Sequence, residues 1–319
     1  MTPDRQVLIV STIADVATDY VVHGLARRGV AHHRINTEDL PFSRTLTLSL
    51  GGRGASSLAF DDHEIAQPSA VWYRRVRSPS RPSEMQEGVY EFCLQENRAA
   101  LLGSIASRQT TWMSHPADVW RAELKPYQLA LAEQVGLRVP KSLVTNAPDA
   151  IRNAFHTFGP MIVKPCRSGY AVVDGEERSI YTSRLLAEHL EFVEEARLSP
   201  AIYQEQIPKR YDIRATVVGT EIFAAAIDSQ SDPAAAVDWR HTANPNLPHL
   251  PIELPSKVRE GVLALMQALG LTFGAVDLVE TPDHDFVFLE VNPNGQWLWI
   301  EDQLQLGITD AIVAWLASK

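Results

Sequence analysis

Two apolar segments near the C-terminus, each with an acidic residue in its interior, constrain the fold more than any other feature of the sequence. Phe273–Glu280 and Phe286–Val291 have the length and composition of buried strands, and Thr281–His284 between them suits a hairpin turn. A carboxylate inside such a strand is costly unless it is paired or binds a metal. The sequence therefore predicts a hairpin whose interior acidic residues, Asp277 and Glu290, are paired or bind a cation.

The expected pairing of these strands brings three oxygen-bearing side chains together. Glu290 and Asn292 project from one face because side chains alternate along a strand. A turn centred on Pro282-Asp283 pairs Asp277 near Phe288, so that Asp277 lies diagonally opposite Glu290 on that face. Two carboxylates and an amide suit Mg²⁺ that shares its coordination with phosphate groups. The alternative interpretation is two edge-strand carboxylates that face water.

The first third of the chain has the pattern of a small α/β domain. Gln6–Ser11 is predicted as a buried strand, Asp15–Gly29 as a helix capped by Asp15, and His33–Asn36 as the next strand. This order predicts a parallel crossover, and the absence of G-x-G-x-x-G argues against a dinucleotide site. A long helix is predicted at residues 84–107. Its apolar stripe would consist of Val89, Phe92, Cys93, Ala99 and Ala100.

The rest of the chain contains further strands and helices separated by polar segments. Strands are predicted at 142–145, 161–164, 201–205, 212–218 and 221–228, and helices at 123–136, 148–158, 183–195 and 255–269. Cys166–Ser179 is polar and contains Gly169 and Gly175, which predicts a turn or a mobile loop. Ala234–Pro251 is predicted to be irregular.

Four basic side chains are candidates for binding phosphate. Lys164 ends an apolar strand beside the glycine-containing loop, and Lys125 opens the helix that precedes this region. Arg214 and Arg240 are candidates because a guanidinium group matches phosphate oxygens in a bidentate manner. For each of them alone, a solvent-exposed basic side chain is the alternative. The sequence has no G-x-x-x-x-G-K-[ST], so a P-loop is not the route to a nucleotide.

Charge and cysteine content exclude several classes of function. The formal net charge is −10, with 29 Lys and Arg against 39 Asp and Glu, which argues against non-specific nucleic-acid binding. The two cysteines, Cys93 and Cys166, form neither a disulfide framework nor a zinc site, which favours a reducing cytoplasm. Since no apolar run approaches the ~20 residues that span a bilayer, we expect a cytoplasmic protein without a membrane or nucleic-acid partner.

The order of these motifs resembles the ATP-grasp superfamily over about residues 120–319. The motifs are Lys125, IVKP with Lys164, the glycine loop, QEQI at 204–207, YDIR with Asp212 and Arg214, and finally D…EVN. The resemblance implies an α/β ATP-grasp fold with an N-terminal α/β (pre-ATP-grasp) domain. It implies a first domain at 1–118 and an ATP-grasp domain at 119–319. The latter would comprise a central or lid subdomain at about 119–204 and a C-terminal metal-binding subdomain at 205–319.

The resemblance also implies roles for individual residues. Lys125 and Lys164 would hold the ATP phosphates, and the hinge residues Glu205, Gln206 and Ile207 would contact adenine. Asp212 would lie near the ribose, and Arg214 and Arg240 would stabilise the transferred phosphoryl group. Mg²⁺ would be held by Asp277, Glu290 and Asn292.

Several stretches are similar, within the superfamily, to the graspetide synthetases, the microviridin-type ligases that macrocyclise ribosomal peptides. These stretches are Val71–Arg77, Ile227–Gln230, Val237–Arg240 and Leu289–Glu301. The similarity implies that a Glu or Asp side chain of a precursor peptide, made of leader and core, is activated as an acyl phosphate. A Ser, Thr or Lys side chain then forms an ester or amide crosslink. It also implies a lid at 166–179 and a homodimer. The Arg74–Arg77 cluster is a candidate site for an acidic peptide, and a solvent-facing run of charges at a strand end is the alternative.

Two other interpretations remain open. The first is another ATP-grasp carboxylate–amine ligase, of the ribosomal-protein-modification or glutathione-synthetase type. The second is a nucleotide-binding regulatory protein with a degenerate site, against which the complete set of lysines and metal ligands argues.

Overall fold

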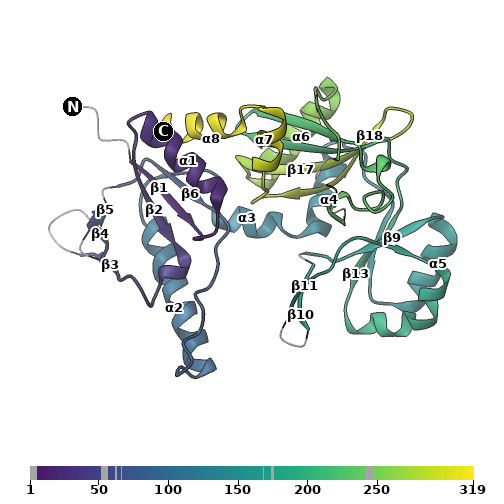
Figure 1. Cartoon of the computed structure of the whole chain (residues 1–319). Coiled ribbons are helices and arrows are strands. Elements are labelled where there is room, and N and C mark those ends of the chain that lie inside the picture. Colours follow the sequence, from purple (N-terminus) through teal and green to yellow (C-terminus); the bar gives the residue numbers. More distant parts are fainter. Residues whose placement is uncertain are drawn as a thin grey trace. The chain divides into compact units, whose positions relative to one another are not determined.

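The computed structural model describes residues 6–51, 57–61, 63–65, 67–167, 169–173, 176–241, 244 and 247–319. The chain forms two compact units, Met1–Pro116 with Gly307–Lys319, and Ala117–Leu306 (Figure 1). The C-terminal segment, expected in the second domain, thus belongs to the first unit. Among the described residues, no helix is both long and apolar enough to cross a bilayer.

The first unit is built on a parallel sheet of order β2-β1-β6-β7. Its strands are β1 (Gln6–Ser11), β2 (Ala31–Asn36), β6 (Ala70–Tyr73) and β7 (Thr111–Trp112). Its helices are α1 (Val16–Arg27), α2 (Glu87–Ala106), α8 (Ile308–Ala317) and the short 3₁₀ helix η1 (Thr37–Asp39). A separate antiparallel sheet contains β3 (Leu46–Ser49), β4 (Ser57–Phe60) and β5 (His63–Ile65).

Helix α8 joins the first unit because it packs closely against α1. A Cβ atom at Gly24 of α1 would lie only 2.6 Å from the Val313 side chain of α8, so the glycine allows the two helices to approach. Three further apolar side chains of α8 are buried, Ile308, Ile312 and Leu316.

The apolar stripe predicted for α2 is wrong. Val89 and Phe92 are 49% and 64% exposed, and the buried residues of the helix are Leu94, Leu101, Ser104 and Ile105. Small or apolar residues occur on more than one side of α2, so periodicity alone did not identify the side that faces the sheet.

Arg74 is not part of a solvent-facing basic cluster. Its Nε donates to Asp15 Oδ2 at 2.7 Å, and both side chains are fully buried. Asp15 precedes α1 as predicted, but its side chain makes no capping hydrogen bond to the helix backbone. The carboxylate instead accepts hydrogen bonds from Ser11 and Thr18. The expected capping residue is therefore one half of a buried ion pair.

The second unit contains two larger sheets and a hairpin. The first sheet has the order β12-β9-β13-β8, with β8 (Ser142–Thr145), β9 (Met161–Lys164), β12 (Ser183–Leu185) and β13 (Ala201–Glu205). Helix α5 (Pro148–Phe158) and the 3₁₀ helix η2 (Ala187–Leu198) accompany it. The hairpin consists of β10 (Tyr170–Val173) and β11 (Glu176–Ser179).

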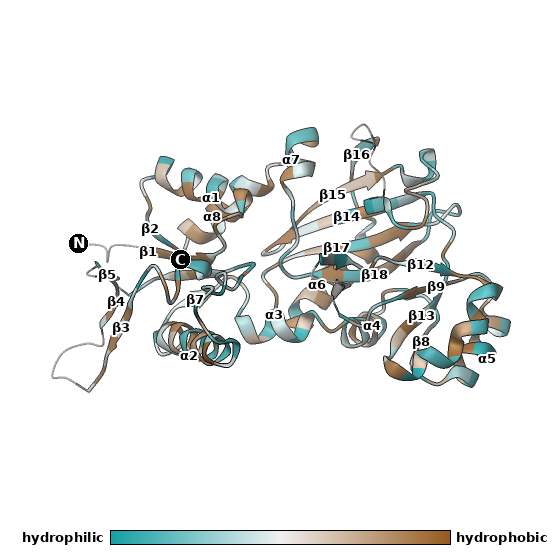
Figure 2. Ribbon diagram, turned by 60° about the horizontal axis from the view of Figure 1, so that its bottom comes forward, coloured by the Kyte–Doolittle hydropathy of each residue, from teal (hydrophilic) through white to brown (hydrophobic). Residues whose placement is uncertain are grey.

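The second sheet is antiparallel, in the order β16-β15-β14-β17-β18. Its strands are β14 (Tyr211–Val218), β15 (Glu221–Ile227), β16 (His249–Ile252), β17 (Phe273–Glu280) and β18 (Phe286–Asn292). The other elements are α3 (Pro116–Ala122), α4 (Lys125–Gln134), α6 (Ser256–Leu269), α7 (Leu298–Leu304), η3 (Ser229–Ser231) and η4 (Trp239–His241). β14 and β15 are brown to white along most of their length in Figure 2, as expected for strands in a core.

The five-stranded sheet has one apolar face and one functional face. Ile213, Ala215 and Val217 of β14 pack into the core formed with α4 and α6. Because side chains alternate along a strand, Asp212 and Arg214 project to the opposite face. This sheet therefore buries one face and leaves the other for polar chemistry.

Three predictions for the second unit need correction. Cys166–Ser179, predicted as a turn or a mobile loop, contains the β10–β11 hairpin, although its Ser168, Asp174 and Gly175 lie outside the described residues. The predicted helix at 183–195 is β12 followed by η2, and the irregular segment 234–251 contains η4 and part of β16. Each of these segments contains residues that pair as strands, and local sequence does not encode such pairing. In addition, α4 packs on β18 and α6, although residues 119–204 were assigned to a lid subdomain.

Candidate active site

A β-bulge brings the two predicted metal carboxylates into register. Leu278 pairs with Phe288, but Asp277 pairs with Glu290, so Leu289 is the extra residue on β18. The predicted pairing of Asp277 with Phe288 is therefore wrong. Without the bulge, Asp277 would face Leu289, and Glu290 would project to the other side of the sheet. The bulge thus places both carboxylates on the functional face.

Glu290 lies between two lysines. Lys125 Nζ is 2.6 Å from Glu290 Oε2, and Lys164 Nζ donates to the backbone oxygen of Leu289 at 3.4 Å. Burial raises the pKa of the Glu290 carboxyl, but the two lysines outweigh it and bring that pKa to about 2. Burial lowers the pKa of Lys164 to about 8, although Glu290 opposes this shift. Glu290 is therefore ionised at neutral pH beside two cationic groups.

Lys125 reaches Glu290 because α4 lies against the edge strand β18. The buried side-chain amide of Gln128, one turn into α4, donates to Val291 O at 2.8 Å and accepts from Val291 N at 2.7 Å. Gln128 therefore satisfies backbone groups that an edge strand leaves unpaired. This pairing fixes the start of α4, and hence Lys125, beside the Glu290 position.

Asp277 is held from two sides. Arg214 Nη1 lies 2.9 and 3.1 Å from the two carboxylate oxygens, and Asn292 Nδ2 donates to Asp277 at 2.9 Å and to Glu290 at 3.4 Å. Burial raises the pKa of Asp277, and Arg214 does not fully offset this effect. Arg214 is only 7% exposed and is directed at Asp277. It is thus better placed to orient that carboxylate than to contact a phosphoryl group.

Gly295 makes room for this arrangement. A Cβ atom at this position would lie 2.4 Å from Ala275 Cβ and 2.8 Å from Arg214 Nη2. Neither neighbour has free space, because Arg214 also donates to the backbone oxygen of Gln296 at 3.2 Å. The glycine therefore determines how closely the segment after β18 packs on the site.

We predict that Gly295→Ala displaces Arg214 from Asp277 and lowers turnover by about tenfold or more, with a loss of about 1–3 kcal/mol in the free energy of unfolding. ADP release and urea unfolding would measure the two effects. Gly103→Ala is the matched control, because nothing lies within 4 Å of a Cβ atom at that helical position. Unchanged turnover in Gly295→Ala would contradict the steric argument.

Arg240 is the exposed cation of the site. It makes a bidentate pair with Asp238 at 2.8 and 2.7 Å, and its Nη1 lies 3.9 Å from Glu290 Oε1. Hydrogen bonding to Asp238 raises the pKa of Arg240, which stays charged. Its guanidinium lies 5.9 Å from the ring centroid of Tyr181, and that ring contacts His241 edge-on at 4.4 Å between centroids. Arg240 is therefore positioned to meet an anion near Glu290.

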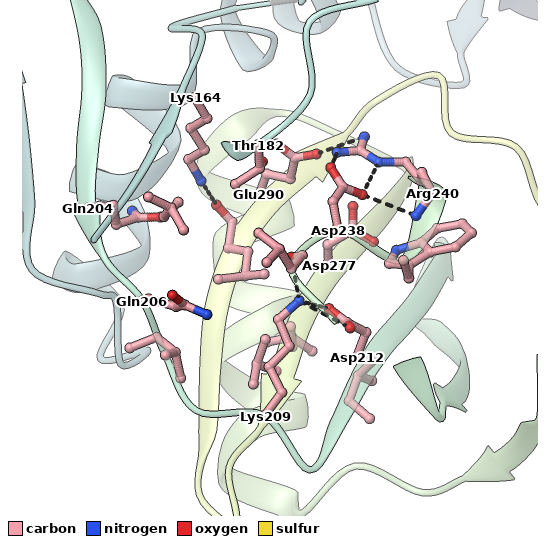
Figure 3. A pocket seen from close by; sticks show the side chains of 18 of the residues that line it. Lys164, Thr182, Gln204, Gln206, Lys209, Asp212, Asp238, Arg240, Asp277 and Glu290 are labelled. Carbon is pink, nitrogen blue, oxygen red and sulfur yellow. Dashed lines mark hydrogen bonds and ion pairs between the residues drawn. The ribbon is translucent and has the colours of Figure 1, made fainter. Parts of the chain in front are cut away.

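A cleft of about 750 Å³ joins these groups to the predicted nucleotide residues. Lys164, Glu290 and Arg240 lie at one end of it, and Lys209 and Asp212 lie at the other (Figure 3). Its remaining polar lining includes Gln204, the hinge residues Glu205 and Gln206, Asp238 and Thr182, and the hinge residue Ile207 contributes an apolar wall. The structure thus gathers the predicted hinge, phosphate and metal residues around one cleft. Lys125 and Asn292 reach it through Glu290 and Asp277.

Asp212 has a partner that sequence analysis missed. Lys209 Nζ lies 2.9 and 3.1 Å from its two oxygens, and Ser229 Oγ donates to it at 2.5 Å. Burial raises the pKa of Asp212 despite these contacts. Asp238 was also missed, although it lies within the stretch Val237–Arg240, whereas Lys209 lies between the QEQI and YDIR motifs. Lys209 is three residues before Asp212, and Asp238 is two before Arg240.

The donor set fits Mg²⁺ better than a transition metal. Asp277 and Glu290 face each other, and a half-turn of the Asn292 amide would present its oxygen to the same point. In the part of the chain that the structure describes, no group of three or more His, Cys, Asp and Glu could hold a metal. A cation here would therefore need further oxygen ligands, and phosphates and water are what Mg²⁺ commonly uses.

Comparisons with known proteins agree with this geometry. A family model described as the MvdD pre-ATP grasp domain matches residues 6–119. A RiPP-associated ATP-grasp ligase from Chryseobacterium gregarium, solved in complex with ADP and a leader and core peptide, has a TM-score of 0.91. It is 26% identical, and the match covers 98% of this chain and 97% of that one.

Two further proteins are similar to this chain, one over nearly its whole length and one over about half of it. Macrocyclase MdnC from Microcystis aeruginosa, bound with precursor peptide MdnA, has a TM-score of 0.87 and 32% identity over 98% of this chain and 100% of its own. Glutamate–LysW ligase ArgX from Sulfolobus acidocaldarius is 30% identical over 164 residues, 49% of this chain and 55% of ArgX. The chain spans about half the length of the curated relatives it matches.

These similarities confirm the predicted ATP-grasp fold with its pre-ATP-grasp domain. MdnC matches along almost the whole of both chains, whereas ArgX matches only about half of each. The chain belongs to the family of ATP-grasp peptide ligases that includes the macrocyclase MdnC.

Proposed function

We propose that this protein is an ADP-forming ligase that crosslinks side chains within a precursor peptide. The observation that carries the proposal is the pairing of Asp277 with Glu290 between Lys125, Lys164 and Arg240, at one end of the cleft. The similarity to MdnC and to the Chryseobacterium ligase supports a peptide as the substrate. A complete set of charged groups argues against a degenerate nucleotide-binding protein.

ATP would enter the cleft as a substrate. The hinge Glu205–Ile207 would contact adenine through its backbone, and the Lys209–Asp212 pair would lie toward the ribose. Lys164 and Lys125 would neutralise phosphate oxygens, because both are already held beside Glu290. Mg²⁺ held by Asp277, Glu290 and Asn292 would supply positive charge to the same oxygens.

The chemistry consists of two transfers. A peptide Glu or Asp carboxylate attacks the γ-phosphorus of ATP, and the bond to ADP breaks, giving an acyl phosphate. A Ser or Thr hydroxyl or a Lys amine of the peptide then attacks the acyl carbon, loses its proton and displaces inorganic phosphate. Arg240 would stabilise charge on the transferred phosphoryl group, and Arg214 would hold Asp277 in place.

Tyr181 is placed to keep water from the reacting groups. It follows the β10–β11 hairpin, and the adjacent Thr182 lines the cleft. Its ring contacts both Arg240 and His241, so it connects the end of the hairpin to η4 beside Arg240. An acyl phosphate hydrolyses when water reaches it, so such a cover would preserve the intermediate.

We predict that Tyr181→Leu raises the number of ADP molecules formed per crosslink about two- to fivefold, while Tyr181→Phe retains the parent ratio. The phenylalanine keeps the ring that meets Arg240 and His241. ADP release and peptide mass would be measured in the same reaction. Tyr20→Leu, at a 52% exposed tyrosine of α1, controls for loss of a surface ring. Equal ratios for Tyr181→Leu and the parent would rule out this role.

Mass spectrometry of a candidate precursor peptide incubated with enzyme, ATP and Mg²⁺ tests the proposed function. A macrocyclase removes one water, about 18 Da, for each crosslink, and the loss requires ATP. A gain equal to an amino-acid residue would favour a ligase of the ArgX type instead. Unchanged mass with peptides rich in Thr, Ser, Lys, Glu and Asp would count against crosslinking. Asp277→Asn is the inactive control.

A further inference from the structure

The first unit contains a second pocket whose charge is opposite to that of the protein. It has a volume of about 400 Å³ and is lined by segments that follow β2 and β6 and by one side of α2. Its lining includes two arginines, Arg77 and Arg98, and no acidic residue. In a chain with a net charge of −10, two arginines without a lining carboxylate indicate a site for an anion.

The two arginines differ from most others of the chain. Arg34, Arg44 and Arg74 of the same unit each form an ion pair with an aspartate. Within the described residues, Arg98 is seen to donate only to Ser78 Oγ, at 2.8 Å, and the side chain of Arg77 forms no ion pair. Their guanidinium groups therefore keep donors for a carboxylate, which they can bind in a bidentate manner.

The rest of the pocket suits an apolar group next to that carboxylate. Its apolar lining includes four leucines: Leu40, Leu94, Leu101 and Leu102. Tyr73 also lines it, and burial raises the pKa of its hydroxyl, which therefore remains a hydrogen-bond donor at neutral pH. An acidic side chain beside a leucine or phenylalanine would match both halves of this lining.

One wall of the pocket is fixed by hydrogen bonds that involve its own lining residues. The segment Arg77–Pro79 forms one wall, and Thr37 Oγ1 donates to Arg77 O at 2.7 Å and accepts from Arg77 N at 2.9 Å. Tyr90 donates to Pro79 O at 2.5 Å. Since these bonds fix the wall without a ligand, binding would not have to order it.

The position in the sheet is also typical of a ligand site. The chain leaves β1 for β2 on one side and later returns to β6 on the other, so the connections diverge around β1. The pocket lies where β2 and β6 end. In open α/β sheets, ligands bind beyond the carboxyl ends of the strands at such a point.

We propose that this pocket binds an acidic–apolar segment of the precursor peptide, separately from the catalytic cleft. The choice of a peptide rests on the proposed function, and the pocket itself supplies the charge and the apolar wall. Arg77 and Arg98 would hold the acidic side chain, and the leucines would hold its apolar neighbour. The site would raise the affinity for substrate without taking part in the chemistry.

Fluorescence anisotropy with a labelled pentapeptide of alternating leucine and glutamate tests this proposal without ATP. We expect Arg98→Gln to raise its Kd about tenfold or more and Arg77→Gln/Arg98→Gln to raise it further. Arg27→Gln removes an exposed arginine of α1 that does not line the pocket, and it should leave the Kd unchanged. The counterpart peptide with glutamine in place of glutamate should bind weakly to every protein.

Equal binding of the two peptides, or equal Kd values for Arg98→Gln and the parent, would overturn the proposal. So would an equal loss in Arg27→Gln, since this would indicate general charge attraction. With a true precursor, the double variant should raise KM and leave kcat unchanged. Absence of crosslinking by the parent enzyme would reject the proposed function alone, because the anisotropy result does not depend on turnover.

Discussion

Glu290→Gln should lower kcat by about a thousandfold or more, because one substitution removes charge from three interactions at once. Glu290 faces Asp277 across the bulge, pairs with Lys125 and lies 3.9 Å from Arg240. Glutamine has nearly the same shape, so the cleft should persist while its affinity for a cation falls. ADP release with saturating peptide at several Mg²⁺ concentrations would measure the effect.

The same variant should lose some stability, because Lys164 is buried and Glu290 favours its charged form. The pKa of Lys164, already lowered to about 8, would fall further. The folded variant would then prefer the neutral amine, and its stability deficit relative to the parent would shrink as the pH rises toward about 8, where Lys164 of the parent also loses its proton, and would stay small above that pH. Urea unfolding at pH 7 and pH 9 would show this difference. Parent-like ADP release by a folded Glu290→Gln protein would refute the metal assignment.

Asn292→Asp provides a matched comparison for the metal assignment. It keeps an oxygen at the position next to both carboxylates but removes the amide donor that bonds them. If these side chains bind Mg²⁺, this variant should retain more activity than Glu290→Gln. If they act only as a hydrogen-bonded cluster, a third negative charge should be at least as harmful.

Sequence patterns predicted the parts of the fold whose signals are local. The strands Ser142–Thr145, Met161–Lys164 and Phe273–Glu280 have the predicted bounds because each is a short apolar run between clear breaks. Helix α6 ends at Gly270, which adopts a left-handed conformation with φ of 72°. The local sequence is sufficient to determine these elements, and their bounds depend little on tertiary contacts.

Strand register and the bulge in β18 could not be predicted from local sequence. The bulge at Leu289 has no local signature, yet it decides whether Asp277 and Glu290 share a face. The sequence singled out Asp277 and Glu290, which the structure brings together, because buried carboxylates in apolar strands are unusual. The geometry of the site was not predicted, because register depends on the whole ladder.

The buried ion pair of the first unit was also not predictable from local sequence. A sequence of neighbouring arginines gave no sign that Arg74 points inward while Arg77 lines a pocket. Both residues follow the end of β6, and Arg75 between them has a φ of 46°, so the alternation of side chains along a strand does not predict their directions. The partner, Asp15, lies far away in the sequence and resembles an ordinary helix cap. Only the parallel pairing of β1 with β6 brings their ends together.

Arg74→Met should therefore destabilise the first unit by about 3–5 kcal/mol, since it leaves the Asp15 carboxylate buried without a counter-charge. Arg27→Met, at an exposed position of α1, should change stability by no more than about 0.5 kcal/mol. Hydrogen exchange of β1 and β6 amides in low urea would measure both. An Arg74→Met deficit no larger than that of Arg27→Met would contradict the prediction.

The pH dependence of this deficit separates lost charge pairing from lost packing. In the parent protein burial raises the pKa of Asp15, but Arg74 outweighs it, so the pair stabilises the fold above the ordinary Asp pKa of 3.8 and less as the pH falls below it. Without Arg74, burial would raise that pKa, and protonation would relieve the unpaired charge. The deficit of Arg74→Met should thus shrink between pH 7 and pH 4, and Arg74→Met/Asp15→Asn should recover most of it at pH 7. A deficit that is constant with pH and unaffected by Asp15→Asn would assign the loss to the packing of Arg74 on Trp72 instead.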